Sequence, residues 1–114
     1  MADKILFGYP HRNGRQNVVV MDHYGPTSYQ TGGESLSPGL YDMAGFDMVT
    51  LPVPAVTESG NYSLGWTRAS GTGGFTLPSV TLQWYVISTG AEVGSGVNLS
   101  TEFLRMELRG ASNL

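Results

Sequence analysis

The most regular alternation of apolar and polar residues lies between positions 80 and 88. Apolar side chains occupy every second position, at Val80, Leu82, Trp84 and Val86. Successive side chains of a β-strand point to opposite faces, so one face of this segment is wholly apolar. The pattern predicts a strand in the centre of a sheet, with Trp84 as its largest contribution to the core.

The same two-residue period predicts strands elsewhere in the chain. Further strands are expected at residues 16–23, 46–51, 62–68 and 102–109, and an apolar segment near residues 5–7 suggests a first edge strand. In the last strand, Leu104, Met106 and Leu108 are expected to face inward, and Arg105, Glu107 and Arg109 to face outward. That alternation is typical of a sheet with one face in water.

Turn-forming residues separate these segments. Gly32 and Gly33 permit a positive φ or a close approach of two backbones. Ser37 can cap a helix, and Pro38 suits its first position because the missing N–H costs nothing there. This is the single helix that the sequence suggests, and Gly45 is expected to end it after roughly two turns.

Six or seven short strands at a spacing of roughly 10–15 residues predict an all-β fold. We expect a small antiparallel β-sandwich, of jelly-roll or immunoglobulin-like topology, with at most one short helix. The expected organisation is an N-terminal arm or edge strand at residues 1–15, a sandwich domain at residues 16–110 and a tail at residues 111–114.

Composition narrows the class of protein further. The 114 residues suit one domain, and 40% of them are hydrophobic while only 13% are charged, about half the usual charged share. The net charge of −3 does not favour nucleic-acid binding. Cysteine is absent, which excludes disulfides and thiolate chemistry, and the sequence contains neither an apolar run of membrane-spanning length nor a signal-peptide core. We therefore expect no membrane partner, and synthesis in a cytoplasm.

Half of the basic residues lie in the first segment. Lys4, Arg12 and Arg15 together with Asp3 give residues 1–15 a charge of +2, so the total of −3 leaves −5 for the rest of the chain. A solvated edge strand and loop is the favoured interpretation, and an arm that reaches an acidic partner surface is the alternative.

A catalytic triad is not expected. Asp22 and His23 are adjacent, and Ser28 and Ser35 follow them. Adjacent residues of a strand point to opposite faces, and no Gly-x-Ser-x-Gly elbow is present.

A metal site is not expected either. His11 and His23 are the only histidines, which excludes a histidine-rich site. The spacing of Glu34, Asp42 and Asp47 matches no calcium-binding loop. The sequence therefore predicts neither a metal nor a cofactor.

Aromatic residues are the remaining candidates for binding. Trp66 and Trp84 lie in apolar alternation, which favours the core for both. Tyr24, Tyr29 and Tyr41 lie in predicted loops and are the better contact candidates. Such tyrosines could stack on sugars, as in carbohydrate-binding modules, or form a subunit interface.

Residues 25–34 read Gly-Pro-Thr-Ser-Tyr-Gln-Thr-Gly-Gly-Glu. This segment resembles a turn segment near the start of the small decoration (cement) proteins of tailed bacteriophage capsids. Residues 82–85, 90–96 and 104–110 are similar to their closing hairpin and terminal strand. The resemblance covers roughly residues 16–110. It implies a β-sandwich, often a dimer or trimer, that binds the outside of the shell, and it brings no catalytic residues.

The resemblance and the composition together suggest a non-enzymatic phage structural protein that binds the outer capsid surface and stabilises contacts between capsomers. The expected partners are the major capsid protein and further copies of this chain, and the expected location is the virion exterior. A carbohydrate-binding or receptor-binding module, or a tail component, is the alternative. The candidate partner contacts are Phe7, Tyr9, Arg12, Arg15, Tyr24, Tyr29 and Tyr41.

Overall fold

The computed structural model describes residues 4–10, 16–41, 43–68 and 79–111, with only the backbone described at residues 4–10, 16, 68 and 111. The strands are β1 (Lys4–Pro10), β2 (Gln16–Tyr24), β3 (Glu34–Leu36), β4 (Met48–Thr50), β5 (Tyr62–Arg68), β6 (Val80–Val86) and β7 (Phe103–Ala111), and the one helical segment among these residues is the 3₁₀ helix η1 (Pro38–Tyr41). The all-β class is confirmed.

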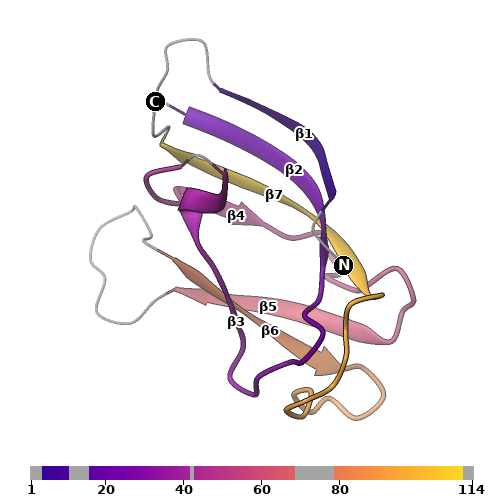
Figure 1. Cartoon of the computed structure of the whole chain (residues 1–114). Coiled ribbons are helices and arrows are strands. Elements are labelled where there is room, and N and C mark those ends of the chain that lie inside the picture. Colours follow the sequence, from indigo (N-terminus) through magenta and orange to yellow (C-terminus); the bar gives the residue numbers. More distant parts are fainter. Residues whose placement is uncertain (1–3, 11–15, 42, 69–78, 112–114) are drawn as a thin grey trace.

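The strands form two antiparallel sheets that face each other (Figure 1). One sheet has the order β1-β2-β7-β4 and the other has the order β3-β6-β5. An immunoglobulin constant-type sandwich places its first, second, fifth and fourth strands in one sheet and its third, sixth and seventh strands in the other. In this chain the fifth and seventh strands are exchanged relative to that order.

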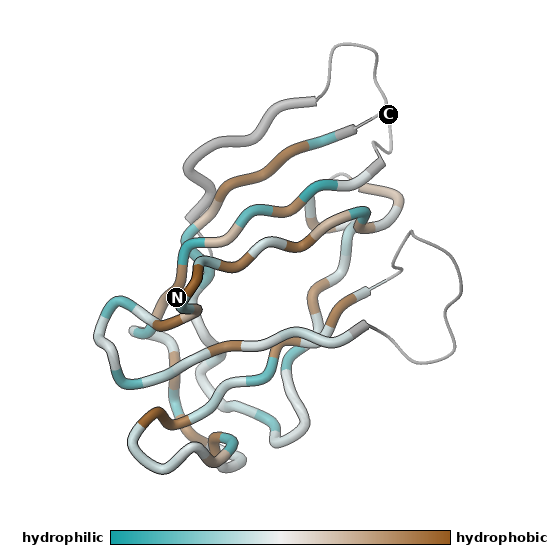
Figure 2. Tube along the Cα trace, turned by 180° about the vertical axis from the view of Figure 1, so that it is seen from behind, coloured by the Kyte–Doolittle hydropathy of each residue, from teal (hydrophilic) through white to brown (hydrophobic). Residues whose placement is uncertain are grey.

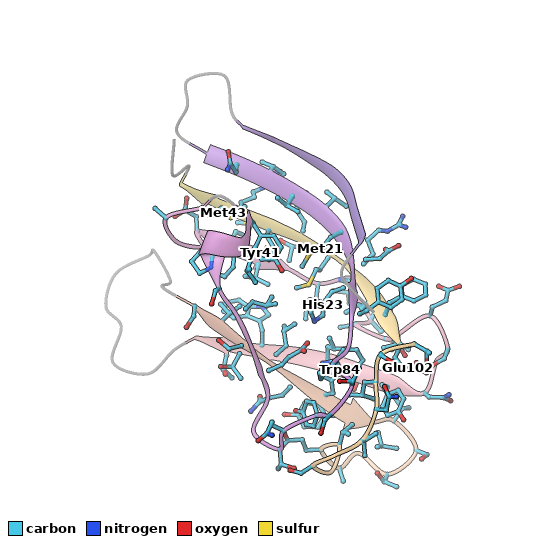
Figure 3. All side chains as sticks on the ribbon, in the orientation of Figure 1. Met21, His23, Tyr41, Met43, Trp84 and Glu102 are labelled. Atoms are coloured by element: carbon cyan, nitrogen blue, oxygen red, sulfur yellow. The ribbon has the colours of Figure 1, made fainter. Side chains whose placement is uncertain are left out.

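One apolar core fills the space between the two sheets (Figure 3). Trp84 is fully buried on β6, the central strand of its sheet, as the alternation predicts. The inward and outward positions of β7 are also as predicted, because Leu104, Met106 and Leu108 are all buried and Arg105 is exposed. Figure 2 shows apolar and polar positions alternating along the strands that enclose this core.

The predicted two-turn helix is wrong in its length. The structure has the single 3₁₀ turn η1, and the chain beyond it carries Tyr41, Met43 and Phe46 into the core. Spacings of two and three residues do not keep three side chains on one face of a helix. The chain therefore leaves the helical path to bury all three, and β4 begins only at Met48.

Two further features differ from the sequence-based expectations. β3 was not predicted as a strand, yet it pairs with β6 from Glu34 opposite Leu82 to Leu36 opposite Val80. Trp66 was predicted to be in the core, but 38% of it is exposed. It lies two residues before the end of β5, where the sandwich covers the side chain only in part.

The N-terminal segment forms an edge strand where the structure describes it. β1 pairs only with β2 in the sheet order, and its register shifts between Ile5 and Phe7. Residues 1–3 and 11–15, which include most of the segment's charge, lie outside the described residues. In the described part of the chain, no helix has the length and apolar character needed to cross a membrane.

Candidate functional site

The outward positions of the four-stranded sheet form one surface, which we call the outer four-stranded face. Because side chains alternate along each strand, the residues opposite to those of the core define it. Its members with described side chains are Val18, Val20, Asp22 and Tyr24 of β2, Met48 and Thr50 of β4, and Phe103, Arg105, Glu107 and Arg109 of β7.

An ion pair fixes one cation on this face. Asp22 lies directly opposite Arg105 in the register of β2 and β7. The Arg105 Nε donates to Asp22 Oδ1 at 2.9 Å, and Nη2 donates to Oδ2 at 3.4 Å. The hydrogen bond to Asp22 and the charge of that carboxylate raise the pKa of Arg105. The Asp22 side chain is only 9% exposed and that of Arg105 is 62% exposed, so a buried carboxylate orients an accessible guanidinium.

An aromatic pair lies next to this ion pair. Tyr24 is directly opposite Phe103, and the two ring centroids are 5.1 Å apart with the planes tilted by 34°. Both residues are half-buried. Cross-strand aromatic pairs stabilise a sheet by more than the burial of their apolar area alone would give. The pair therefore provides a well-ordered apolar surface at this end of the face.

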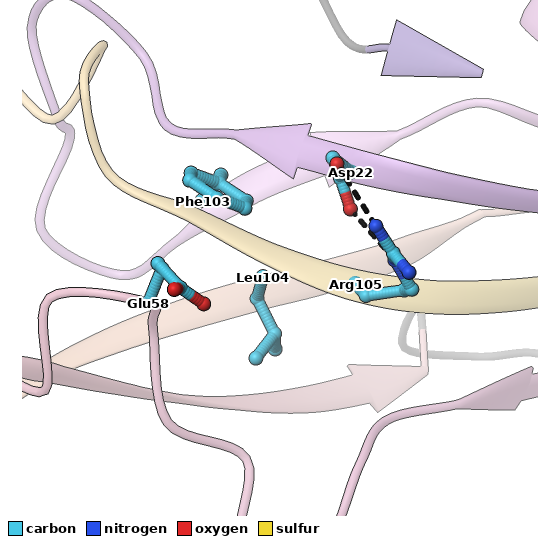
Figure 4. A pocket seen from close by; sticks show the side chains of 5 residues that line it. All are labelled: Asp22, Glu58, Phe103, Leu104 and Arg105. Atoms are coloured by element: carbon cyan, nitrogen blue, oxygen red, sulfur yellow. Dashed lines mark hydrogen bonds and ion pairs between the residues drawn. The ribbon is translucent and has the colours of Figure 1, made fainter. Parts of the chain in front are cut away.

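A small hollow opens where this end of the face meets the loop after β4 (Figure 4). We call it the Glu58 hollow; its volume is about 290 Å³, and it is lined by Asp22, Glu58, Phe103, Leu104 and Arg105. The backbone N–H of Glu58 donates to the carbonyl of Phe103 at 3.1 Å, which holds the loop against β7. The hollow therefore combines one apolar wall with three charged side chains.

The other end of the face carries an exposed methionine beside a second ion pair. Arg109 Nε donates to Glu107 Oε2 at 2.9 Å, and both side chains are partly accessible. Met48 lies opposite Arg109 in the register of β4 and β7 and is 53% exposed. The charges with described side chains on this face are thus matched in pairs.

Comparisons with known proteins find no match: no protein-family model, no curated protein and no solved structure is similar to this chain. Its function therefore has to be inferred from the geometry of its own residues.

The predicted contact residues divide into three groups. Tyr24 lies on the outer four-stranded face, although at the end of β2 rather than in a loop. Phe7 and Tyr9 belong to β1 and lie opposite Val20 and Val18 in the register, so the backbone places them at the edge of the same sheet. Arg12 and Arg15 lie outside the described residues.

Tyr29 and Tyr41 are buried, which contradicts their assignment as surface contacts. Tyr29 is 0% exposed; its hydroxyl donates to Glu92 Oε2 at 2.7 Å and accepts the backbone N–H of Trp84 at 3.1 Å. Burial, followed by the effects of Glu92, raises the pKa of Tyr29 to about 12. Tyr41 is 8% exposed, with its ring centroid 6.3 Å from that of Phe46. Both rings belong to the core between the sheets, because burying a large apolar side chain is favourable wherever the chain can carry it inward.

Asp22 and His23 point to opposite sides of the sheet, as predicted. Asp22 pairs with Arg105 outside, whereas His23 is buried inside and its Nε2 is hydrogen-bonded to Glu34 Oε1. Trp84 Nε1 donates to the same Glu34 oxygen at 3.1 Å. These contacts join β2 of one sheet to β3 and β6 of the other, so the buried histidine has a structural role.

Of the three carboxylates considered above and not expected to bind calcium, Glu34 and Asp47 are described and Asp42 is not. Among the residues that the structure describes, no group of three or more histidine and acidic side chains is placed to hold a metal ion.

Sequence reasoning missed the hollow. Phe103, Arg105 and Glu58 were not among the predicted contacts, although Arg105 was expected to face outward. The alternation of β7 reveals which residues face out, but the pairing of Arg105 with Asp22 depends on the register of two strands far apart in the chain.

Proposed function

We propose that this protein is a non-enzymatic structural component of a tailed-phage virion. It binds the outer surface of the capsid and stabilises contacts between capsomers. Its main partner is the major capsid protein, and it acts as a homo-oligomer on the virion exterior. The observation that supports this proposal best is the outer four-stranded face, which places an oriented arginine beside an aromatic pair.

The residue types on this face support a role in protein contact. Tyrosine, phenylalanine, methionine and arginine are enriched where proteins bind each other, and the face contains each of them. Arg105 is already held by Asp22, so little side-chain freedom would be lost when it meets a partner. The paired charges limit the cost of removing this surface from water.

A repeating lattice suits a surface of this modest size. Each copy can bind weakly and still be retained, if the copy or its oligomer engages more than one capsomer, because the second contact is then intramolecular. The segments that resemble capsid decoration proteins, at residues 25–34 and 82–110, support the same class of partner.

Two matched substitutions test the proposal. Thr50→Arg places a bulky cation on the outer four-stranded face, and Thr67→Arg places the same side chain on the outer face of the other sheet; both threonines are exposed strand residues. Each purified variant is added to DNA-filled heads that lack the protein, and occupancy is measured by quantitative mass spectrometry of the pelleted heads. We expect Thr50→Arg to weaken binding by about tenfold or more, equivalent to about 1.4 kcal/mol, and Thr67→Arg to bind as the wild type does.

Equal occupancy of both variants would contradict the assignment of the face. The same heads also test cementing, because occupied heads should rupture at a higher temperature than bare heads. Equal rupture temperatures would contradict a stabilising role.

A carbohydrate-binding or receptor-binding module is the second candidate. The buried Tyr29 and Tyr41 no longer support it, but the outer face of the three-stranded sheet does. Its described residues carry hydroxyl and amide groups and no charge: Ser35, Ser63, Thr67, Thr81, Gln83 and Tyr85. Glycan-array binding that is lost in Thr67→Arg and kept in Thr50→Arg would favour this candidate over the capsid.

A further inference from the structure

The Glu58 hollow has a composition that selects one kind of partner side chain. We infer that it accepts a single cationic side chain, an arginine guanidinium, from the protein that binds the outer four-stranded face. This inference rests on the proposed function, because it names the chemistry of the partner at that same face.

The charges around the hollow leave an excess of one carboxylate. Asp22 and Arg105 neutralise each other through two hydrogen bonds. Glu58 adds a second negative charge, and it is close enough to contribute to the raised pKa of Arg105 through space. Among the described residues, no side chain donates a hydrogen bond to the Glu58 carboxylate. A partner cation would therefore complete the charge balance of the hollow.

The walls of the hollow suit a planar cation. Figure 4 shows Glu58 and Phe103 toward one end of the hollow and the Asp22–Arg105 pair toward the other, with the Phe103 ring and the Leu104 side chain on opposite sides of β7. A guanidinium can stack on an aromatic ring while its edge donates two hydrogen bonds to a carboxylate. Lysine has a compact, strongly hydrated charge and cannot make both contacts in this way, so arginine is the better fit.

The size and the rigidity of the hollow also favour one side chain. Pockets for small molecules usually span about 300–1,000 Å³, and this hollow, at about 290 Å³, is just below that range. Its position is fixed by backbone hydrogen bonds from Glu58 to Phe103 at 3.1 Å and from Gly60 to Thr57 at 2.9 Å. A preformed site loses little entropy on binding.

The test uses the purified chain and two nearly isosteric probes. N-acetyl-arginine amide is titrated into ¹⁵N-labelled protein, and amide chemical shifts are followed by NMR; N-acetyl-citrulline amide has a similar shape without the charge. We expect saturable shifts around Glu58 and Phe103 with a dissociation constant on the order of millimolar, and binding at least about fivefold weaker for citrulline.

Two isosteric variants test whether Glu58 is the carboxylate that binds the arginine probe. Glu58→Gln should reduce arginine binding to the level of citrulline. Glu107→Gln removes a carboxylate from the same face that is already bound by Arg109, and it should bind arginine as the wild type does. Equal binding of both probes, or unchanged binding in Glu58→Gln, would overturn the inference.

Failure of this inference can be distinguished from failure of the proposed function. Arginine binding without occupancy of heads would overturn the capsid role and leave the cation site standing. Occupancy of heads that is unaffected by Glu58→Gln would overturn the cation site alone. A dimer in sedimentation that dissociates in Glu58→Gln would assign the hollow to a second copy of this chain and overturn the inference of a separate partner.

Discussion

Tyr29 joins three distant segments of the chain through one phenol oxygen. The hydroxyl donates to Glu92 and accepts the backbone N–H of Trp84, and the same Glu92 oxygen accepts the N–H of Gly32 at 2.7 Å. A buried phenol whose proton is directed at a carboxylate strongly resists ionisation, which is why its pKa rises to about 12.

This shift predicts a loss of stability in alkali. The folded state favours the neutral phenol, so its contribution is complete below pH 10 and is lost as the pH rises through 12. The free energy of unfolding should fall by about 1 kcal/mol by pH 11 and by about 2–3 kcal/mol in total, since one pKa unit corresponds to about 1.4 kcal/mol. Urea denaturation at pH 8, 10 and 11 measures the change.

Tyr29→Phe provides the control for that measurement. This variant lacks the ionisable group, so its stability should fall less between pH 10 and 11 than that of the wild type. An identical pH dependence in both proteins would show that Tyr29 is not the group responsible.

At the scale of single residues, the sequence predicted the direction in which strand side chains point better than it predicted which loop side chains are buried. Alternation correctly placed Leu104 and Trp84 in the core, because a strand has a fixed two-residue period. No such period applies to Tyr29, whose burial depends on the contacts of its loop with Trp84 and Glu92. Trp66 fails for a related reason: its face is correct, but its position near a strand end leaves it partly exposed.

Among the elements, β3 is a strand that the alternation of apolar and polar residues does not reveal. Its three residues include Glu34, an acidic residue that strands disfavour, and that carboxylate is satisfied by His23 and Trp84 on two other strands. The sequence reveals such a strand only once its long-range partners are known.

The turn before β3 depends on a glycine. Gly33 has a φ of 119°, and a Cβ there would lie 2.4 Å from Thr81 Cγ2 and 2.7 Å from the Leu82 carbonyl oxygen. We expect Gly33→Ala to reduce the free energy of unfolding by at least about 2 kcal/mol, because the strained φ and the backbone contact both oppose the methyl group.

Gly39→Ala, the same substitution at a glycine in η1, is the matched control for Gly33→Ala. A Cβ at Gly39 has no atom within 4 Å, and the change should alter stability by no more than about 0.5 kcal/mol. Both variants are compared by urea denaturation, and similar midpoints for the two would contradict the close approach of the turn to β6.

The whole molecule presents two different outer surfaces. The outer four-stranded face carries paired charges, an aromatic pair and the Glu58 hollow, whereas the described residues of the opposite outer face are polar and uncharged. The all-β class was predictable from alternation and composition. The site was not, because it is created by the register of β2 against β7 and by a loop that packs on them.

The central claim, attachment to a capsid, is tested most directly by separating a phage lysate that contains this protein on a density gradient. Mass spectrometry across the fractions gives its ratio to the major capsid protein. We predict that the protein travels with DNA-filled heads at a fixed ratio consistent with a lattice site. Recovery as free protein at the top of the gradient, or only a few copies per particle, would contradict the claim.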